Sequence, residues 1–365
     1  MKIINVVGAR PNFMKVAPIH RALERHDTLS SLIVHTGQHY DEEMSDIFFE
    51  QLEMPRPDRY LGVGSASHAV QTARIMTAFE EVVKEVQPDL VNVVGDVNST
   101  VACSLVATKM HIPVAHVEAG LRSGDRRMPE EINRIVTDRI ADLLFVTEPS
   151  GVENLRSEGV EDERIAFVGN VMIDSLMSFR EKARATGIVE ELDLASDDYV
   201  LMTMHRPSNV DHREGVETLL ELLRLLAEHT SVVFPMHPRT RNRFEQFGLD
   251  DELDSIDRLV VLPPQGYLQF LALMEEASVV VTDSGGIQEE TTFLKVPCIT
   301  LRENTERPVT IDEGTNELMD IDPAAVVDRV LERQDEDTRG KTPRNWDGQA
   351  ADRIVKRLYG FLASE

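Results

Sequence analysis

The chain has 365 residues, 42% of them hydrophobic, which is enough to build two domain cores of ordinary size. Asp and Glu number 64 against 38 Lys and Arg, so the net charge of -26 argues against nucleic acid, whose phosphates need a basic face. No apolar run reaches the roughly 18 residues of a membrane span, and the first residues lack the features of a signal peptide. We expect a cytoplasmic protein without membrane or nucleic-acid partners. Because acids are spread over most helices, we also expect a halophilic one.

Strand and helix patterns alternate along the first half of the chain. Short apolar, β-branched runs predict strands at 2–8, 31–37, 90–96, 113–119 and 142–148. Helical periodicity lies between most of them, notably at 14–25 and 67–86. Such alternation is typical of a parallel sheet with helices on its faces. We expect residues 1–170 to form a Rossmann-like, doubly wound domain.

The second half repeats this alternation. Strands are predicted at 198–205, 231–237, 258–264, 278–284 and 297–303. The polar segment 332–348 is interpreted as a loop, and 349–362 as a last amphipathic helix. We expect a second Rossmann-like domain at 171–348, with the C-terminal residues 349–365 joining the first domain. The fold class is therefore α/β, with two doubly wound parallel-sheet domains.

Polar side chains follow nearly every expected strand of the first half, at the edge where open α/β sheets bind ligands. They are Arg10, Lys15, Gln38, His39, Asp96, Glu118, Glu130 and Arg134. Single residues also have structural explanations, since Asp96 is placed to cap the next helix and Glu118 to pair with Arg122. Because such residues recur in both halves, together they favour a functional site.

Residues 278–290 combine a strand, a Ser284-Gly285-Gly286 turn and the start of a helix. Free backbone N–H groups and the helix dipole favour an anion at such a turn, and paired glycines let a phosphate approach the main chain. Glu290, one turn further on, is placed to hold ribose hydroxyls. The pattern is weak alone, because many α/β domains use it only as a tight connection. Two histidines follow other strands of this half, His205 and His237.

Seven spaced segments, in order over nearly the whole chain, carry a more specific signal than any single motif. They are MKIINVVGARPNFMK, HTGQHYDEEM, GDVNST, HVEAGLRSGDRRMPEEINR, the His205-Arg206 element, TDSGGIQEE and ENTERP. Together they closely resemble the non-hydrolysing UDP-N-acetylglucosamine 2-epimerases. The resemblance implies a GT-B-like fold with the nucleotide sugar in the interdomain cleft, and a homodimer. The implied reaction interconverts UDP-GlcNAc and UDP-ManNAc, which serve glycan and polysaccharide synthesis.

The resemblance also implies roles for the matching residues. Asp96, Glu118 and Glu130 would handle protons at or near C2, with the base left open, and His205 would assist departure of the diphosphate. The implied substrate-binding residues are Arg10, Lys15, Arg134, His237, Gln265, Phe270, Ser284, Gly285, Gly286, Glu290 and Arg307. Gln265 and Phe270 match the uracil-binding segment, although they also suit a turn and a helix core. Gln38 and His39 match a segment near a second, activating UDP-GlcNAc in bacterial relatives, and whether that regulation exists here is left open.

The sequence departs from the family's pattern at two places. Pro207-Ser208-Asn209 stands where many relatives have a Glu, so any hydrogen bond from that Glu is absent or replaced by Ser208. Pro238-Arg239-Thr240 follows His237 where many bacterial relatives have Asn-Pro, and this variant resembles archaeal-type members.

The chemistry of the sugar narrows the mechanism. Its C2 hydrogen is not adjacent to a carbonyl, so simple deprotonation is implausible without a hydride cofactor, yet no convincing GxGxxG follows the first strand. Cys103 and Cys298 lack metal-ligand spacing, so we expect neither cofactor nor metal. Elimination of UDP as C2 loses its proton forms a 2-acetamidoglucal. This route allows C2 to be inverted without a hydride cofactor. Alternatives are a GT-B-type glycosyltransferase, a hydrolysing epimerase that releases ManNAc, and a nucleotide-sugar sensor without turnover.

Overall fold

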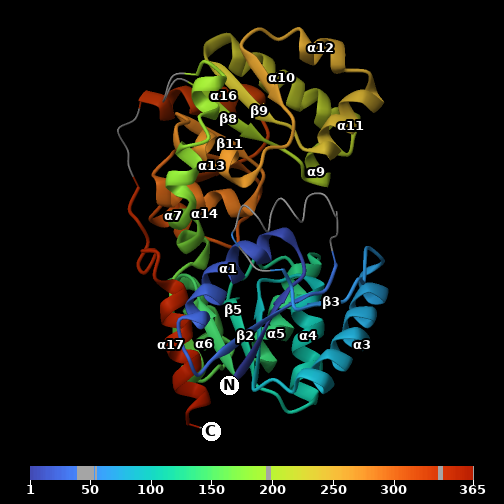
Figure 1. The fold of residues 1–365 in the computed structure, drawn as a ribbon. Coiled ribbons are helices and arrows are strands. Elements are labelled where there is room, and N and C mark those ends of the chain that lie inside the picture. The colour runs from blue at the N-terminus through green and yellow to red at the C-terminus, as the bar shows by residue number, and fades with distance from the viewer. Residues whose placement is uncertain (39–52, 54–55, 195–198, 336–339, 365) are drawn as a thin grey trace. The chain divides into compact units, whose positions relative to one another are not determined.

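The chain forms two compact units in a computed structural model that describes residues 1–38, 53, 56–194, 199–335 and 340–364. Unit 1 comprises Met1–Ser178 and Arg344–Glu365, and unit 2 comprises Phe179–Pro343 (Figure 1). The division falls inside helix α7 (Val171–Arg184), which begins where the sequence was expected to pass from one domain to the next.

Unit 1 is built on a parallel sheet with the strand order β3-β2-β1-β4-β5-β6-β7 in the part of the chain described. The strands are β1 (Lys2–Val7), β2 (Ser30–His35), β3 (Arg59–Tyr60), β4 (Leu90–Val94), β5 (Val114–Ala119), β6 (Leu143–Val146) and β7 (Ile165–Phe167). Their apolar runs are buried on both faces, which is typical of a parallel sheet between helices. The strand order reverses between β1 and β4, and this switch point is where such sheets bind ligands.

The helices of unit 1 connect these strands. They are α1 (Arg10–Glu24), α3 (His68–Val86), α4 (Asn98–Lys109), α5 (Pro129–Ile140), α6 (Pro149–Ser157), the 3-10 turn η1 (Asp162–Arg164) and α17 (Ala350–Leu362). Helix α1 begins four residues before the expected Met14, because Pro11 suits a first turn whose N–H groups need no helical partner. The last helix, α17, packs against α1 (Figure 1). Asp174 caps it by accepting hydrogen bonds from the Ala350 and Ala351 N–H groups at 3.1 and 2.9 Å.

Unit 2 repeats the architecture with the strand order β10-β9-β8-β11-β12-β13. Its strands are β8 (Tyr199–Thr203), β9 (Ser231–Pro235), β10 (Leu259–Leu262), β11 (Val279–Thr282), β12 (Cys298–Leu301) and β13 (Asn316–Met319). Its helices are α8 (Ile188–Glu191), α9 (Pro207–Val210), α10 (Arg213–His229), α11 (Pro238–Phe247), α12 (Asp250–Asp254), α13 (Tyr267–Glu275), α14 (Gly285–Leu294), α15 (Val309–Asp312) and α16 (Pro323–Asp335). The switch point lies between β8 and β11.

The predicted fold class, two doubly wound parallel-sheet domains, is confirmed. Each of the ten expected strands is present, whereas β3, β7 and β13 were not expected, because they are short and only partly buried or exposed. The expected loop at 332–348 is wrong at its start, since α16 continues to Asp335. No described helix is long and apolar enough to cross a membrane.

Candidate functional site

The switch point of unit 1 is a tightly packed junction of strand ends. A Cβ atom on Gly8, at the end of β1, would lie 2.3 Å from the Ser99 Oγ, so only glycine lets the turn approach α4. Asn12 accepts hydrogen bonds from the Gly8 and Ala9 N–H groups at 3.2 and 2.9 Å, and donates to the Val94 carbonyl at 3.1 Å. Asn12 therefore ties β1 to β4. Its role was not predicted, although it is a buried polar residue of the ARPNFMK motif.

Two predicted residues meet at this junction, since Lys15 forms an ion pair with Glu118. Both side chains are buried, and Glu118 ends β5 with a φ of 76°, a conformation uncommon for glutamate. A Cβ atom on Gly95 would lie 3.7 Å from the Glu118 Oε2 and 3.9 Å from the Lys15 Nζ. A buried carboxylate with one ammonium partner is thus held at the end of β5. The alternative pairing of Glu118 with Arg122 is wrong, because Arg122 binds Asp138 and Glu158.

Asp96 and Arg134 form a second predicted cluster. The Arg134 Nε and Nη2 lie 3.0 and 2.9 Å from the Asp96 Oδ2, and its Nη1 lies 2.5 Å from the Glu131 Oε2. The Asp96 side chain is 33% exposed, whereas that of Arg134 is 5% exposed. The buried guanidinium therefore orients a carboxylate that remains open to solvent. The alternative role of Asp96 as a helix cap is wrong, because Val97 is the N-cap residue of α4 and the Asp96 carboxylate binds Arg134.

The other predicted site residues of unit 1 do not belong to either of these two clusters. Glu130 is half-buried in the first turn of α5. The Gln38 Oε1 accepts hydrogen bonds from the Ser99 N–H and Oγ at 2.9 and 2.7 Å, so its side chain is engaged inside the unit. Arg10 opens α1, but its side chain lies outside what the structure describes, as does the whole of His39.

In unit 2, the ends of β8, β9 and β11 bring together two histidines and an aspartate. The Asp283 Oδ2 accepts hydrogen bonds from the His205 and Arg206 N–H groups at 3.0 and 2.8 Å, and its Oδ1 lies 3.2 Å from the His205 Nδ1. The rings of His205 and His237 stack with their centroids 5.2 Å apart. Burial and the neighbouring His205 and Arg239 lower the pKa of His237. The buried Asp283 carboxylate therefore holds the His205 imidazole, and the His205 side chain remains 40% exposed.

The start of α14 has the features of the anion site that the sequence predicts. Ser284 precedes the helix, and a Cβ atom added to Gly286 would meet open space. A Cβ atom on Gly285 would lie 3.4 Å from the Arg302 Nη1 and 3.5 Å from the Arg307 Nη1. Two guanidiniums therefore accompany the free N–H groups of the helix. Arg302 was not anticipated, although its place directly after the β12 strand was a signal.

Carboxylates hold these arginines in place. Arg302 and Arg307 contact Glu306 at 3.0 and 3.5 Å, and the Arg307 Nε lies 2.8 Å from the Glu289 Oε1. Burial alone would raise the pKa of Glu306, but the charge of Arg307 and the hydrogen bond and charge of Arg302 lower it to about 2. An anion at the helix N-terminus would therefore meet guanidiniums that are already fixed.

Glu290 lies one turn further along α14 and accepts a hydrogen bond from the Tyr267 hydroxyl at 2.8 Å. Burial raises the pKa of Glu290 to about 7, opposed by the Tyr267 hydrogen bond and reinforced by Glu289. Tyr267 was not anticipated. Gln265 donates to the Pro263 carbonyl at 2.8 Å, as its alternative role in a turn predicts, and Phe270 is half-buried on α13.

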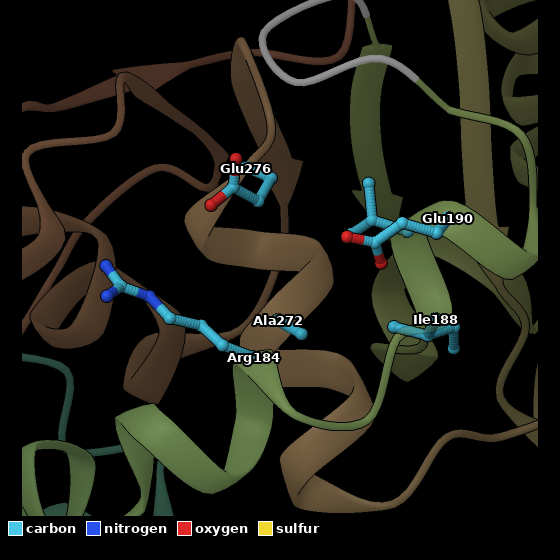
Figure 2. Close-up of a pocket in the computed structure, with 6 residues that line it drawn as sticks. Arg184, Ile188, Glu190, Ala272 and Glu276 are labelled. Carbon is cyan, nitrogen blue, oxygen red and sulfur yellow. The ribbon is translucent and has the colours of Figure 1, made fainter.

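The described residues offer no stronger candidate for a functional site than the strand ends. No group of three or more His, Cys, Asp or Glu residues in the described part of the chain is placed to hold a metal ion. A pocket of about 250 Å³ lies elsewhere in unit 2 (Figure 2). It is lined by Arg184, Ile188, Val189, Glu190, Ala272 and Glu276. None of these residues belongs to the predicted site.

Two Rossmann-type parallel sheets, each with ionisable side chains and glycine turns gathered at its switch point, define the class of protein. The chain is a GT-B-like α/β protein.

Similarity to known proteins gives the family. The UDP-N-acetylglucosamine 2-epimerase family matches residues 21–359. The UDP-N-acetylglucosamine 2-epimerase of Methanocaldococcus jannaschii is 42% identical over 366 residues, covering 99% of this chain and 100% of the relative. The crystal structure of that organism's UDP-GlcNAc 2-epimerase, in complex with UDP-GlcNAc and UDP, has a TM-score of 0.90 at 41% identity over 99% of this chain and 100% of the other. The chain therefore belongs to the UDP-N-acetylglucosamine 2-epimerase family.

A third relative differs in its named substrate. The UDP-2,3-diacetamido-2,3-dideoxy-D-glucuronate 2-epimerase of Pseudomonas aeruginosa is 41% identical over 367 residues, covering 98% of this chain and 99% of the relative. Similarity of this order is thus shared by relatives that act on different 2-acetamido sugars.

Proposed function

We propose that the protein is a non-hydrolysing UDP-N-acetylglucosamine 2-epimerase that interconverts UDP-GlcNAc and UDP-ManNAc. The observation that carries the proposal is the buried Glu118–Lys15 pair at the switch point of unit 1, in a chain 42% identical to a named UDP-N-acetylglucosamine 2-epimerase over almost its whole length. An enzyme that must move a proton at carbon needs a positioned base, and a carboxylate fixed in this way can serve as one.

Unit 1 acts on the sugar in this proposal. Glu118 is the penultimate residue of β5 and Asp96 follows the neighbouring strand β4, so both carboxylates are available at one sheet edge. One removes the C2 proton as the C1–O bond to UDP breaks, giving 2-acetamidoglucal. A proton then returns to the other face of C2 while UDP adds back at C1, and this inverts C2 without a redox step. Lys15 and Arg134 orient the carboxylates, and Glu130 is a third candidate near C2.

Unit 2 holds UDP. Ser284, the N–H groups of Gly285 and Gly286, and the guanidiniums of Arg302 and Arg307 bind the diphosphate, whose negative charge grows as the C1–O bond breaks. Stabilisation of that charge accelerates departure of UDP.

The remaining groups of unit 2 fix the nucleoside and assist the leaving group. His205, oriented by Asp283, stabilises the departing diphosphate, and His237 supports its ring by stacking. Glu290 accepts hydrogen bonds from the ribose hydroxyls, while Gln265 and Phe270 contact the uracil.

A second candidate substrate is UDP-2,3-diacetamido-2,3-dideoxy-D-glucuronate, because the Pseudomonas relative named for it is 41% identical. It carries the same 2-acetamido group and UDP leaving group, so the same elimination serves it. Turnover of each compound at equal concentration decides between the two substrates.

We further propose a cytoplasmic homodimer adapted to high salt. The net charge of -26 supports salt adaptation, since dense negative charge is tolerated where counterions are abundant. Light scattering of the purified protein in about 2 M KCl would test the dimer at an ionic strength where surface charges are screened.

Incubation with UDP-GlcNAc in high-salt D2O, followed by proton NMR, tests the activity. We expect UDP-ManNAc with deuterium at C2. Free ManNAc and UDP would instead identify a hydrolysing epimerase, and unchanged substrate despite binding would point to a glycosyltransferase or a sensor.

A further inference from the structure

Glu118 keeps its place through a backbone conformation that glutamate rarely adopts. Its φ of 76° is left-handed, and the pairing of β5 with β6 shifts in register between Val117 and Ala119. Gly95, at the end of β4, donates to the Val117 carbonyl at 3.0 Å, and Gly120 follows the shift; both glycines also have positive φ. Bulges of this kind re-aim side chains near active sites, and such a backbone persists only where its surroundings fix it.

A buried histidine and aspartate are bonded to both glycines. The His116 Nε2 lies 2.8 Å from the Gly95 carbonyl oxygen, and its Nδ1 lies 2.6 Å from the Asp138 Oδ1. The Asp138 Oδ2 accepts a hydrogen bond from the Gly120 N–H at 3.0 Å. The His116 and Asp138 side chains are 0% and 1% exposed. One continuous chain of hydrogen bonds therefore links the end of β4 to the Ala119–Gly120 peptide, one residue beyond Glu118.

The protons of this chain can be assigned from its geometry. The Gly95 carbonyl only accepts, so the His116 Nε2 carries a proton, and a second proton lies between its Nδ1 and Asp138. The Arg122 Nη1 lies 2.7 Å from the Asp138 Oδ2 and favours the ionised carboxylate. Burial acts to raise the pKa of Asp138, but His116 and Arg122 outweigh it and lower that pKa. The two buried side chains are therefore joined by a proton between the His116 Nδ1 and the Asp138 carboxylate.

We propose that His116 and Asp138 are positioning residues that hold the left-handed backbone of Glu118 and thereby keep its carboxylate beside Lys15. The inference rests on the proposed function, because it takes Glu118 as a carboxylate that acts at C2. Neither residue touches the sugar, and both act through the peptide groups of Gly95 and Gly120. A merely structural pair would affect the stability of the enzyme and leave the turnover of its folded form unchanged.

Three variants separate these two roles. Asp138→Ala removes the bonds to His116 and Gly120. Asp138→Asn retains them, because its amide donates to a neutral His116 ring while its oxygen accepts from the Gly120 N–H. His20→Ala is the matched control, since His20 is a buried histidine of the same unit that bonds the Ser31 Oγ at 2.7 Å, on the strand β2 rather than at the end of β5.

For each variant, kcat, KM, UDP affinity and the unfolding temperature are measured, and a crystal structure of Asp138→Ala gives the φ of residue 118. We expect Asp138→Ala to lower kcat about 10- to 100-fold, with KM and UDP affinity within about threefold, because a misplacement of about 1 Å is enough for such a loss. Residue 118 should leave the left-handed region. Asp138→Asn should stay within about threefold of the wild-type kcat, and His20→Ala should lose stability alone.

An unchanged kcat in Asp138→Ala, with a φ at residue 118 that stays near its wild-type value, would overturn the inference. Equal losses of turnover in Asp138→Ala and His20→Ala would also overturn it. If Asp138→Ala does not fold, His116→Gln replaces it with the same expectations, because glutamine reaches only one of the two partners. A shifted φ with an unchanged kcat would support the positioning of the backbone and reject Glu118 as the C2 carboxylate, so the two proposals fail separately.

Discussion

The two units share one architecture, yet their switch points carry opposite chemistry. In unit 1 the strand ends present carboxylates, and each of Glu118 and Asp96 has a buried cationic partner. In unit 2 the corresponding positions present imidazoles, free N–H groups and guanidiniums, and Glu306 and Glu289 hold the guanidinium of Arg307.

This difference shows that the parallel sheet determines where the site lies, whereas the residues at the strand ends determine its chemistry. A carboxylate that removes a proton from carbon must be fixed in direction, and unit 1 fixes Glu118 through its backbone. A site that holds a departing diphosphate needs preorganised positive charge, and unit 2 provides it at the start of α14. We therefore expect changes in unit 1 to affect turnover, and changes in unit 2 to affect nucleotide affinity.

The largest effect is expected in unit 1. Glu118→Gln keeps the size of the side chain but removes its basicity, so kcat should fall by about 10³-fold, within the range of acid–base catalysis. UDP affinity, measured by calorimetry, should change by less than about threefold. Glu153→Gln, an exposed residue of α6, is the control and should retain full activity. Full activity in Glu118→Gln would contradict the catalytic role assigned to unit 1.

A smaller effect is expected in unit 2. Arg307→Ala should weaken UDP binding by about 10- to 100-fold, because a charge-assisted hydrogen bond contributes about 1.5–3 kcal/mol. The kcat at saturating UDP-GlcNAc should fall less than in Glu118→Gln. Arg329→Ala, which removes an arginine paired with Glu317 elsewhere in unit 2, is the control. A normal UDP affinity in Arg307→Ala would contradict the role of unit 2.

The pH dependence of binding sharpens the comparison within unit 2. Because the pKa of Glu290 is about 7, its carboxyl group is mostly protonated at low pH and becomes an acceptor for both ribose hydroxyls as pH rises. Binding of UDP-GlcNAc, measured by calorimetry in the Glu118→Gln background, should therefore strengthen about tenfold from pH 6 to pH 8.

Two variants check that Glu290 causes this effect. Glu290→Gln should make the affinity independent of pH over the same range. Tyr267→Phe removes a donor that stabilises the carboxylate, so the midpoint should move to higher pH. A pH dependence that survives in Glu290→Gln would assign it to another group.

The smallest effect concerns salt. Raising KCl from about 0.1 to 2 M should screen the net charge of -26 and raise the unfolding midpoint, by about 5 °C for a gain of about 1–2 kcal/mol. Trp346 is the sole tryptophan and is buried in unit 1, where it donates to the Thr147 carbonyl at 3.0 Å. Its fluorescence therefore reports unit 1, while circular dichroism reports both units. A midpoint that falls with salt would argue against halophilic adaptation.

Much of the fold could be predicted from the sequence, because buried parallel strands are short apolar runs between helical segments. The strands β3 and β13 lack such runs, and β7 has only three residues, so these strands were not recognised. The strand-end rule also predicted that Glu118, Asp96 and His205 lie at the carboxyl ends of their sheets, since parallel strands bring these ends to one edge.

The partners of these residues could not be predicted, since they depend on side-chain direction in three dimensions. Arg134 is predicted to bind substrate, and its ion pairs with Asp96 and Glu131 were not foreseen. Tyr267 lies 23 residues from its partner Glu290, and His116 lies 22 residues from its partner Asp138. Spacing along the chain does not reveal such contacts.

Cleavage of the C1–O bond during epimerisation is the central claim, and positional isotope exchange tests it most directly. UDP-GlcNAc carrying oxygen-18 between C1 and the β-phosphorus would be incubated with the enzyme and followed by phosphorus NMR. If UDP departs and returns, the label will move into the non-bridging positions of the β-phosphate as UDP-ManNAc forms. Inversion at C2 with the label still in the bridge would contradict elimination and the division of labour between the two units.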